Sequence, residues 1–101
     1  MAEYVAFQGG SGQSYSYMPV EGAPDLARRA GNFVLAVPQG RGWRILDLGQ
    51  SDDLGQKPWR GAPASAKVLV RLNVSRAARE RELEDLLAAR ETLPSAQAMA
   101  S

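Results

Sequence analysis

Cysteine and histidine are both absent from the 101-residue chain. Without cysteine there is no disulfide framework and no thiolate nucleophile, and without histidine the commonest zinc ligand and general base are missing. Most hydrolase mechanisms are excluded on these grounds, and we expect no cofactor. No apolar run approaches the roughly 20 residues needed to span a bilayer. We therefore expect a cytoplasmic protein with no membrane partner.

The composition is that of one small domain. The hydrophobic fraction of 45% and the charged fraction of 23% are close to the averages for folded proteins, and the net charge of +1 does not by itself imply an affinity for nucleic acid. We expect a single domain over residues 1–91. The small, uncharged residues from Thr92 onward predict a flexible C-terminal tail at 92–101.

The centre of the sequence is a stretch marked by glycines at both ends, Gly31 and Gly49. Residues 32–37 are apolar at almost every position, which is typical of a central strand covered on both sides. Residues 38–42 are turn formers, and residues 43–48 mix apolar with charged side chains. This pattern predicts two adjacent strands, of which the second is covered less completely.

A second hairpin is expected at the N-terminus. Residues 3–8 and 13–18 alternate polar with apolar or aromatic side chains around Gly9-Gly10-Ser11-Gly12. The competing interpretation is a phosphate-binding loop, but no Lys-Ser/Thr pair or helix signal follows the glycines. The hairpin is favoured for that reason.

The linking segments carry weaker signals. Pro24 and Asp25 near the start, with Arg28 and Arg29 near the end, allow one short helix within residues 19–30. Residues 50–63 are rich in glycine and proline and predict at most a single turn, capped by Ser51 or Asp52. The Asp52-Asp53 pair could bind a hard cation, but adjacent acids at a helix start are more often capping groups.

The last third predicts a strand and then a helix. Residues 66–73 alternate, with Val68, Val70 and Leu72 expected inward and Lys67 and Arg71 outward. Ser75 is a suitable N-cap for a helix beginning at Arg76, whose apolar face is predicted to include Leu83, Leu86 and Leu87. The whole chain predicts an α+β fold: a small mixed or antiparallel β-sheet with an N-terminal hairpin, flanked by one or two short helices and a longer C-terminal helix.

The glycine-marked stretch resembles the GIY-YIG nuclease superfamily. The resemblance covers about residues 31–94 and depends on Gly31-Asn32-Phe33, then Asp47-Leu48-Gly49, and a distal helix containing Glu-Leu-Glu-Asp-Leu-Leu. It implies that the two tripeptides lie on adjacent strands, followed by a short helix with an arginine and then by a strand and a helix with a metal-binding glutamate. It also implies an ancestral activity that cuts phosphodiesters.

The positions that the resemblance makes catalytic are substituted. Phe33 replaces a tyrosine and lacks the hydroxyl, Asp47 replaces the second tyrosine and adds a negative charge, and Lys57 stands near the arginine without its planar fork. The glutamate falls beside Leu83, at either Glu82 or Glu84. We therefore expect no catalytic residues and no resident metal. Loss of several transition-state contacts from one site leaves little activity.

Three functions remain open. The first is a non-catalytic binding module for DNA or RNA, because residues 41–81 contain nine Lys or Arg and four Asp or Glu. The candidate contact residues are Arg44, Lys57, Trp59 and Arg60, although Trp59 could equally be a lid over the core. The same cations, including Lys67, Arg71, Arg76 and Arg79, could merely be solvated.

The second is a protein-interaction or homodimeric structural module. It would use Tyr15 and Tyr17 on an exposed hairpin edge, where a strand from another chain could pair. The third is a metal-dependent endonuclease with an altered site, in which Asp47 and Glu82 or Glu84 hold a metal ion together.

Overall fold

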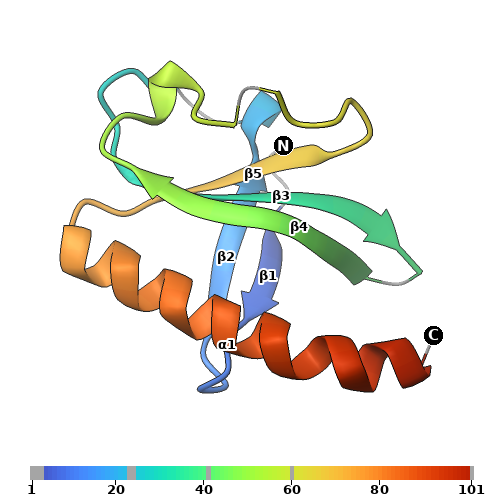
Figure 1. Cartoon of the computed structure of the whole chain (residues 1–101). Helices are drawn as coiled ribbons and strands as arrows, with labels where there is room; N and C mark the ends of the chain where they lie inside the picture. The colour runs from blue at the N-terminus through green and yellow to red at the C-terminus, as the bar shows by residue number, and fades with distance from the viewer. Residues whose placement is uncertain (1–3, 23–24, 41, 60, 101) are drawn as a thin grey trace.

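The protein is an antiparallel five-stranded sheet with one long C-terminal helix (Figure 1). The computed structural model describes residues 4–22, 25–40, 42–59 and 61–100. The elements are β1 (Val5–Gln8), β2 (Ser14–Pro19), the 3-10 turn η1 (Val20–Gly22), β3 (Gly31–Gln39), β4 (Gly42–Ser51), the 3-10 turn η2 (Leu54–Gln56), β5 (Lys67–Leu72) and α1 (Arg76–Ala100). The strand order is β1-β2-β5-β3-β4, so the predicted α+β class is confirmed and the sheet is antiparallel.

The two predicted hairpins are both present. β1 pairs antiparallel with β2, and the turn between them is closed by hydrogen bonds from the Gly9 amide to the Gln13 carbonyl and from the Gly12 amide to the Gly9 carbonyl. Gly12 has a φ of 93°, which glycine adopts without steric cost. β3 pairs with β4 over the whole length of the hairpin, with one bulge between Leu35 and Ala36. β3 is three residues and β4 four residues longer than the runs 32–37 and 43–48 that predicted them.

β3 is buried on both faces, as its apolar run predicted. On one face Val34 and Ala36 join Leu69, Tyr17 and Leu86 in a core covered by α1. The other face carries a second, smaller core, covered by the loops between strands, whose buried members are Phe33, Leu54 and Val70. We call these two sides of the sheet the helix face and the loop face. Every residue from 31 to 36 is consequently buried.

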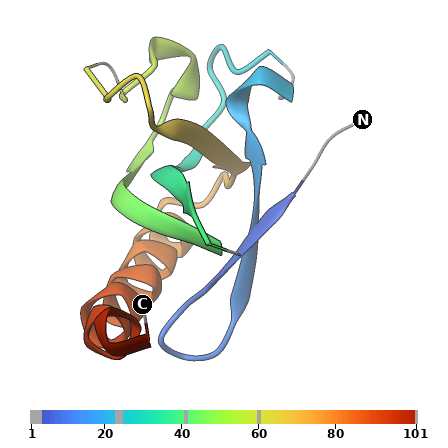
Figure 2. The same ribbon diagram turned by 90° about the vertical axis from the view of Figure 1, so that its right-hand side faces the viewer.

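The sheet opens between β2 and β5. These two strands pair only at Met18 with Val70 and at Pro19 with Leu69. Beyond this short ladder β2 turns away with β1, and the hairpin curls down beside α1, as the two views show (Figures 1 and 2). The divergence lets the helix pack between the hairpin and the rest of the sheet.

The helix begins where the sequence predicts, but its buried face differs. The Ser75 hydroxyl accepts a hydrogen bond from the Ala78 amide at 3.2 Å, which is N-capping geometry. The buried side chains of the described part are Arg79, Glu82, Leu86 and Ala89. Leu87, predicted to be on the apolar face, is 39% exposed. The prediction is confirmed at Leu86 and wrong at Leu87, because the charged residues Arg79 and Glu82 share the buried stripe with Leu86.

Two further local predictions need correction. Residues 25–30 form a turn at Ala27 and Arg28 and contain no helix, while the predicted position Pro24 lies outside the described residues. The turn after β4 is capped by Asp53, whose carboxylate accepts the Gly55 amide. The capping role favoured for the Asp52-Asp53 pair is confirmed at Asp53, and the prediction of Ser51 or Asp52 as the cap was wrong. Such turns are too short for the sequence to fix which of several adjacent polar residues caps them.

α1 runs to Ala100, past the predicted domain boundary at residue 91. The flexible tail at 92–101 stays a prediction. No helix in the described part of the chain is both long enough and apolar enough to cross a membrane.

Candidate functional site

The glycines and Phe33 of the resemblance form one packed unit on the loop face. β3 and β4 are adjacent, and Phe33 stands opposite Gly49 in the ladder. A Cβ added to Gly49 would lie 2.6 Å from the Phe33 ring, so the ring lies directly over the glycine backbone. Trp59 meets the same ring at 5.8 Å between centroids in an edge-on arrangement. Phe33 is thus a core residue, held by a glycine on one side and an indole on the other.

The substituted catalytic positions do not converge. Asp47 pairs with Leu35, which puts it on the loop face with Phe33, and its side chain is exposed. Lys57 is exposed at the C-terminal cap of η2. Glu82 belongs to α1 on the helix face, and Glu84 is exposed on the same helix. The sheet therefore separates Asp47 from Glu82, and the described residues contain no cluster of three or more carboxylates, histidines or cysteines suited to a metal ion.

Glu82 is instead the centre of a buried hydrogen-bond network. Its side chain is 3% exposed; one carboxylate oxygen accepts the Tyr17 hydroxyl, and the other accepts Arg71 Nε at 2.9 Å. Asn73 Nδ2 approaches that second oxygen at 3.5 Å. A buried carboxylate requires such partners because its desolvation is otherwise too costly. The network joins β2, β5 and α1 at the point where the sheet opens.

Arg79 has a matching role one turn earlier. The side chain is 3% exposed and donates to the Asn73 and Val74 carbonyls, to Gln50 Oε1 at 2.7 Å and to Asp52 Oδ1 at 2.7 Å. Its own carbonyl accepts Asn32 Nδ2 at 3.1 Å. The interpretation of Arg79 and Arg71 as solvated outward cations was wrong, because both point at the helix–sheet interface. The Arg79 guanidinium thus provides donors for two backbone carbonyls that follow the end of β5.

Tyr15 and Tyr17 are buried rather than exposed, with 8% and 0% of their surfaces accessible. Tyr17 makes an edge-on contact with Phe7, and both tyrosine hydroxyls donate to carboxylates of α1. β2 is also an interior strand of the sheet, between β1 and β5. The feature that suggested a protein-binding edge is therefore part of the core.

Asp85 fixes the glycine turn of the N-terminal hairpin to the helix. Its carboxylate accepts the Ser11 amide at 2.8 Å, the Ser11 hydroxyl at 2.7 Å and the Tyr15 hydroxyl at 2.7 Å. The hydrogen bonds from Ser11 and then Tyr15 lower the pKa of Asp85. Burial, with the hydrogen bond to Asp85, raises the pKa of Tyr15 to about 12, and burial with the bond to Glu82 also raises the pKa of Tyr17.

These tyrosines predict a loss of stability in alkali. A group whose pKa is raised on folding stabilises the folded state below its ordinary pKa and ceases to do so as the pH passes its folded pKa. The Tyr15 contribution should therefore be complete below pH 10 and disappear between pH 10 and about 12. Urea unfolding at several pH values, with phenolate absorbance recorded in parallel, measures this. In Tyr15→Phe the decline over that interval should be smaller, and an identical decline would contradict the assignment.

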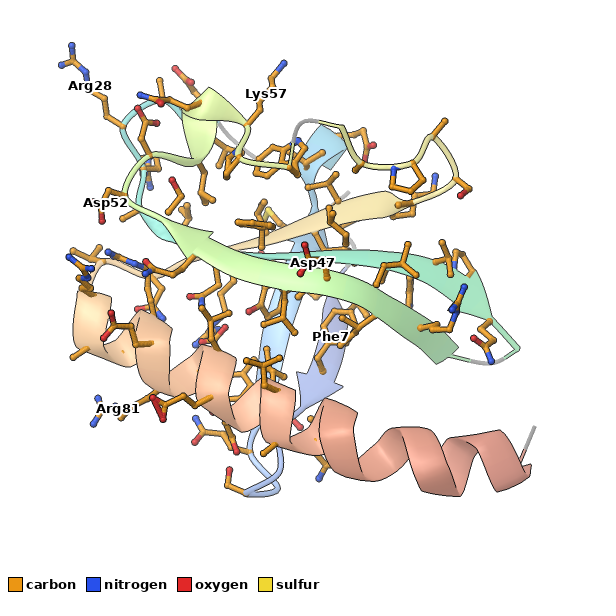
Figure 3. The ribbon with its side chains drawn as sticks, in the orientation of Figure 1. Phe7, Arg28, Asp47, Asp52, Lys57 and Arg81 are labelled. Carbon is orange, nitrogen blue, oxygen red and sulfur yellow. The ribbon has the colours of Figure 1, made fainter. Side chains whose placement is uncertain are left out.

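Three exposed cations lie on the loops at one end of the molecule. Arg28 and Lys57 are non-glycine residues with positive φ, 61° and 54°, and both are exposed. Their segments touch, because Asp53 Oδ1 accepts both the Arg28 and the Gly55 amides. Figure 3 shows the two side chains projecting outward from the same end of the molecule. We call Arg28, Arg29 and Lys57 the cationic loop surface.

The neighbouring acids are engaged in structural bonds. Asp25 accepts the Ala27 amide, Asp53 is the cap described above, and Asp52 pairs with Arg79. No ion pair among the described residues involves a member of the cationic loop surface. These side chains are therefore available to an external anion.

The other predicted nucleic-acid residues are not all near this surface. Arg44 is exposed near the start of β4, whereas η2 and Lys57 follow the end of that strand. Trp59 is partly buried and packs on the loop-face core, which is the position of a lid. A stacking role for its remaining surface stays a prediction, and Arg60 lies outside the described residues.

The local excess of cations is smaller than the sequence suggested. Of the seven cations in residues 41–81 that the structure describes, three pair with carboxylates: Arg71 with Glu82, Arg76 with Glu80 and Arg79 with Asp52. Arg28 and Arg29, which complete the cationic loop surface, lie outside that window. In the sequence the adjacent pair Arg28-Arg29 could touch phosphate, but the favoured interpretation is solvation, because an exposed basic pair is more often just solvated.

The comparisons with known proteins add no relative. No family model matches the chain, and neither a curated protein nor a solved structure similar to it was found.

Proposed function

We propose that the chain is a non-catalytic binding module that binds single-stranded nucleic acid through the cationic loop surface. The observation that carries the proposal is the backbone conformation at Arg28 and Lys57. Both have positive φ, which costs a side-chain-bearing residue on the order of 1 kcal/mol and which glycine or asparagine would adopt more easily. Two exposed cations at such positions, on touching loops and without an ion pair in the described structure, are the basis of the proposal.

The surface suits a phosphate backbone. Lys57 is held at its position by a backbone hydrogen bond to the Leu54 carbonyl, and Arg28 by the Asp53 carboxylate. Arg29 is exposed beside them, and its amide donates to the Leu26 carbonyl. These bonds fix the backbone at both positions and leave the cationic side chains exposed, where they can meet phosphates, and Trp59 beyond Lys57 offers part of an aromatic face to a base. A cytoplasmic location, where nucleic acids are accessible, is part of the proposal.

Descent from a GIY-YIG nuclease remains part of the proposal as well. The order β3, β4, η2, β5, α1 and the adjacency of the two glycine-bearing strands support it. Loss of catalysis is supported by the burial of Glu82 in its network with Tyr17 and Arg71, on the side of the sheet away from Asp47. An altered metal-dependent endonuclease would need these carboxylates together.

The test is fluorescence anisotropy of short labelled single-stranded DNA and RNA, titrated at several salt concentrations. The double variant Arg28→Asn/Lys57→Asn removes two charges, while asparagine tolerates the left-handed conformation. We expect at least tenfold weaker binding at low salt. The slope of log K against log salt should become shallower by about 1.4, because each phosphate contact on a single strand contributes roughly 0.7.

The matched control is Lys67→Gln/Arg76→Gln, which removes the same charge from exposed positions on β5 and α1. It should retain most of the affinity. Binding that ignores salt, or an equal loss in both double variants, would overturn the proposed surface. Nicking of supercoiled plasmid in Mg²⁺ or Mn²⁺ above the level of an Asp47→Ala control would overturn the non-catalytic assignment. Concentration-dependent sedimentation without nucleic-acid binding would favour the homodimeric module instead.

A further inference from the structure

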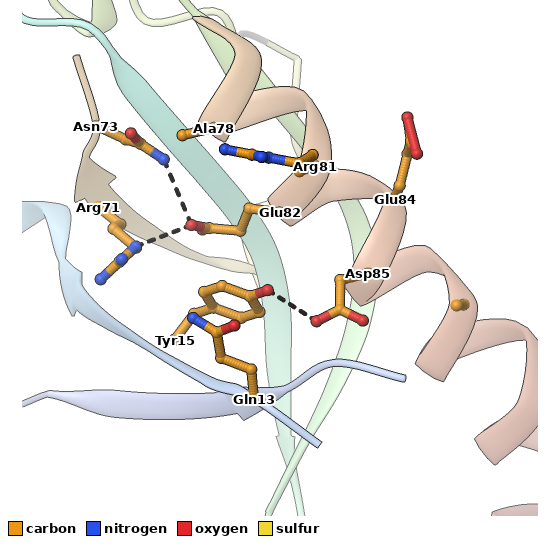
Figure 4. Close-up of a pocket in the computed structure, with 10 residues that line it drawn as sticks. Gln13, Tyr15, Arg71, Asn73, Ala78, Arg81, Glu82, Glu84 and Asp85 are labelled. Carbon is orange, nitrogen blue, oxygen red and sulfur yellow. Dashed lines mark hydrogen bonds and ion pairs between the residues drawn. The ribbon is translucent and has the colours of Figure 1, made fainter. Parts of the chain in front are cut away.

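A polar groove lies on the other side of the molecule, where β2 and β5 diverge and α1 crosses the opening. Its volume is about 670 Å³, and it is lined by Gln13, Tyr15, Arg71, Asn73, Ala78, Arg81, Glu82, Glu84, Asp85 and Ala88 (Figure 4). Protein pockets that bind small molecules commonly have volumes of roughly 300 to 1,000 Å³. The cationic loop surface contributes no residue to it.

Two of the carboxylates in the groove are already used. Asp85 accepts three hydrogen bonds from Ser11 and Tyr15, and Glu82 accepts those of Tyr17, Arg71 and Asn73. Their charges are thus held by internal donors. Among the described residues, no hydrogen bond or ion pair of Glu84 is present, so it is the carboxylate of the groove that has its acceptors available.

Two arginines offer donors to the same space. Arg71 is fixed by its Nε bond to Glu82 and by its position over the Tyr15 ring, 5.7 Å from the centroid. Its terminal guanidinium nitrogens make no hydrogen bond to a described residue, and its side chain is 36% exposed. Arg81 lies on the helix wall of the groove, is exposed, and is likewise without an ion pair in the described structure. A guanidinium held at one nitrogen is preorganised to bind a carboxylate with the others.

We propose that this groove binds a small zwitterion of the short-peptide class. The ligand carboxylate would contact the terminal nitrogens of Arg71 and Arg81, and its ammonium group would face Glu84. A simple anion is disfavoured because the groove holds three carboxylates and two arginines. A simple cation is disfavoured because both arginines face it. An extended dipeptide spans about 7 Å, which the groove accommodates.

The test uses the dipeptide Ala-Ala and two capped forms of it. Chemical shifts of ¹⁵N-labelled full-length protein are recorded during titration with Ala-Ala, N-acetyl-Ala-Ala and Ala-Ala-amide. Ala-Ala should move the amide signals of groove residues such as Gln13, Asn73 and Ala78 and should give saturable binding. Each capped form should bind at least threefold more weakly, since the acetyl group removes the ammonium and the amide removes the carboxylate.

Variants at exposed positions separate the site from the fold. Arg81→Gln and Glu84→Gln should each weaken Ala-Ala binding at least threefold and leave the urea midpoint unchanged, because neither side chain makes a hydrogen bond in the described structure. Arg76→Gln, on the same helix but outside the groove, is the matched control and should bind normally. Absence of saturable shifts at groove residues, equal binding of all three peptides, or equal effects of the three variants would each overturn the proposal.

Discussion

Replacement of Glu82 by alanine should destabilise the protein by about 3 kcal/mol, because it removes a buried carboxylate that accepts one buried hydroxyl and one partly exposed guanidinium. The Tyr17 hydroxyl, on a side chain with no accessible surface, would lose its acceptor, and Arg71 would lose the carboxylate that fixes it. A buried donor left without a partner keeps its full desolvation cost. Urea unfolding followed by circular dichroism measures the change.

The neighbouring Glu84 is the matched control. It lies two residues further along the same helix, is exposed, and makes no hydrogen bond within the described structure. Glu84→Ala should therefore change the free energy of unfolding by no more than about 0.5 kcal/mol. Glu82→Gln keeps an oxygen for Tyr17 but loses the ion pair with Arg71, and should fall between the two. Equal losses at positions 82 and 84 would show that the buried network does not hold α1 to the sheet.

Substitution of Gly31 by alanine is expected to have the second large effect. The added Cβ would press against the backbone carbonyl of Arg71 on β5 and would lie 2.8 Å from Leu54 Cδ1. The carbonyl cannot move without displacing β5 from β3, which pair at this end of the sheet. Overpacking of this kind costs typically 1 to 3 kcal/mol, and a rigid backbone neighbour places Gly31→Ala at about 3 kcal/mol.

Gly42→Ala provides the comparison within the same β3–β4 hairpin. Gly42 starts β4, and a Cβ there would have no atom within 4 Å. Its substitution should leave the thermal midpoint within a few degrees, whereas Gly31→Ala should lower it by more than about 10 °C, given roughly 4 to 8 °C per kcal/mol for a domain of this size. A small effect at position 31 would mean that β5 can shift away from β3 at little cost.

Gly31 and Gly49 each have a specific packing role in the β3–β4 hairpin. Gly31 allows β5 and Leu54 to approach, and Gly49 allows the Phe33 ring to lie on the backbone of β4. Packing alone therefore explains why glycine is present at both positions, without a role in catalysis. Phe33 completes the unit as a buried side chain. The binding and cleavage experiments described above therefore test the proposed nucleic-acid surface and the proposed loss of catalysis.

The sequence by itself determined the strands, the two hairpins, the start of α1 and the absence of thiol and imidazole chemistry. Those features follow from local causes: the apolar run of residues 32–37, the turn glycines, the Ser75 cap and the residue types present. Periodicity and capping act over a few neighbouring residues, so they can be read from the chain directly.

Only the tertiary structure decided the roles of the charged residues. From the sequence, the charged residues Arg71, Arg79 and Glu82 would be expected on the solvent-exposed faces of a strand and a helix, where charged side chains ordinarily lie. They are inside or at the interface here because β2 diverges from β5 and the opened sheet needs donors and acceptors where its ladder ends. The contacts involved join segments far apart in the chain: the Asn32 side chain donates to the Arg79 carbonyl, 47 residues away. No local sequence pattern can predict such a contact.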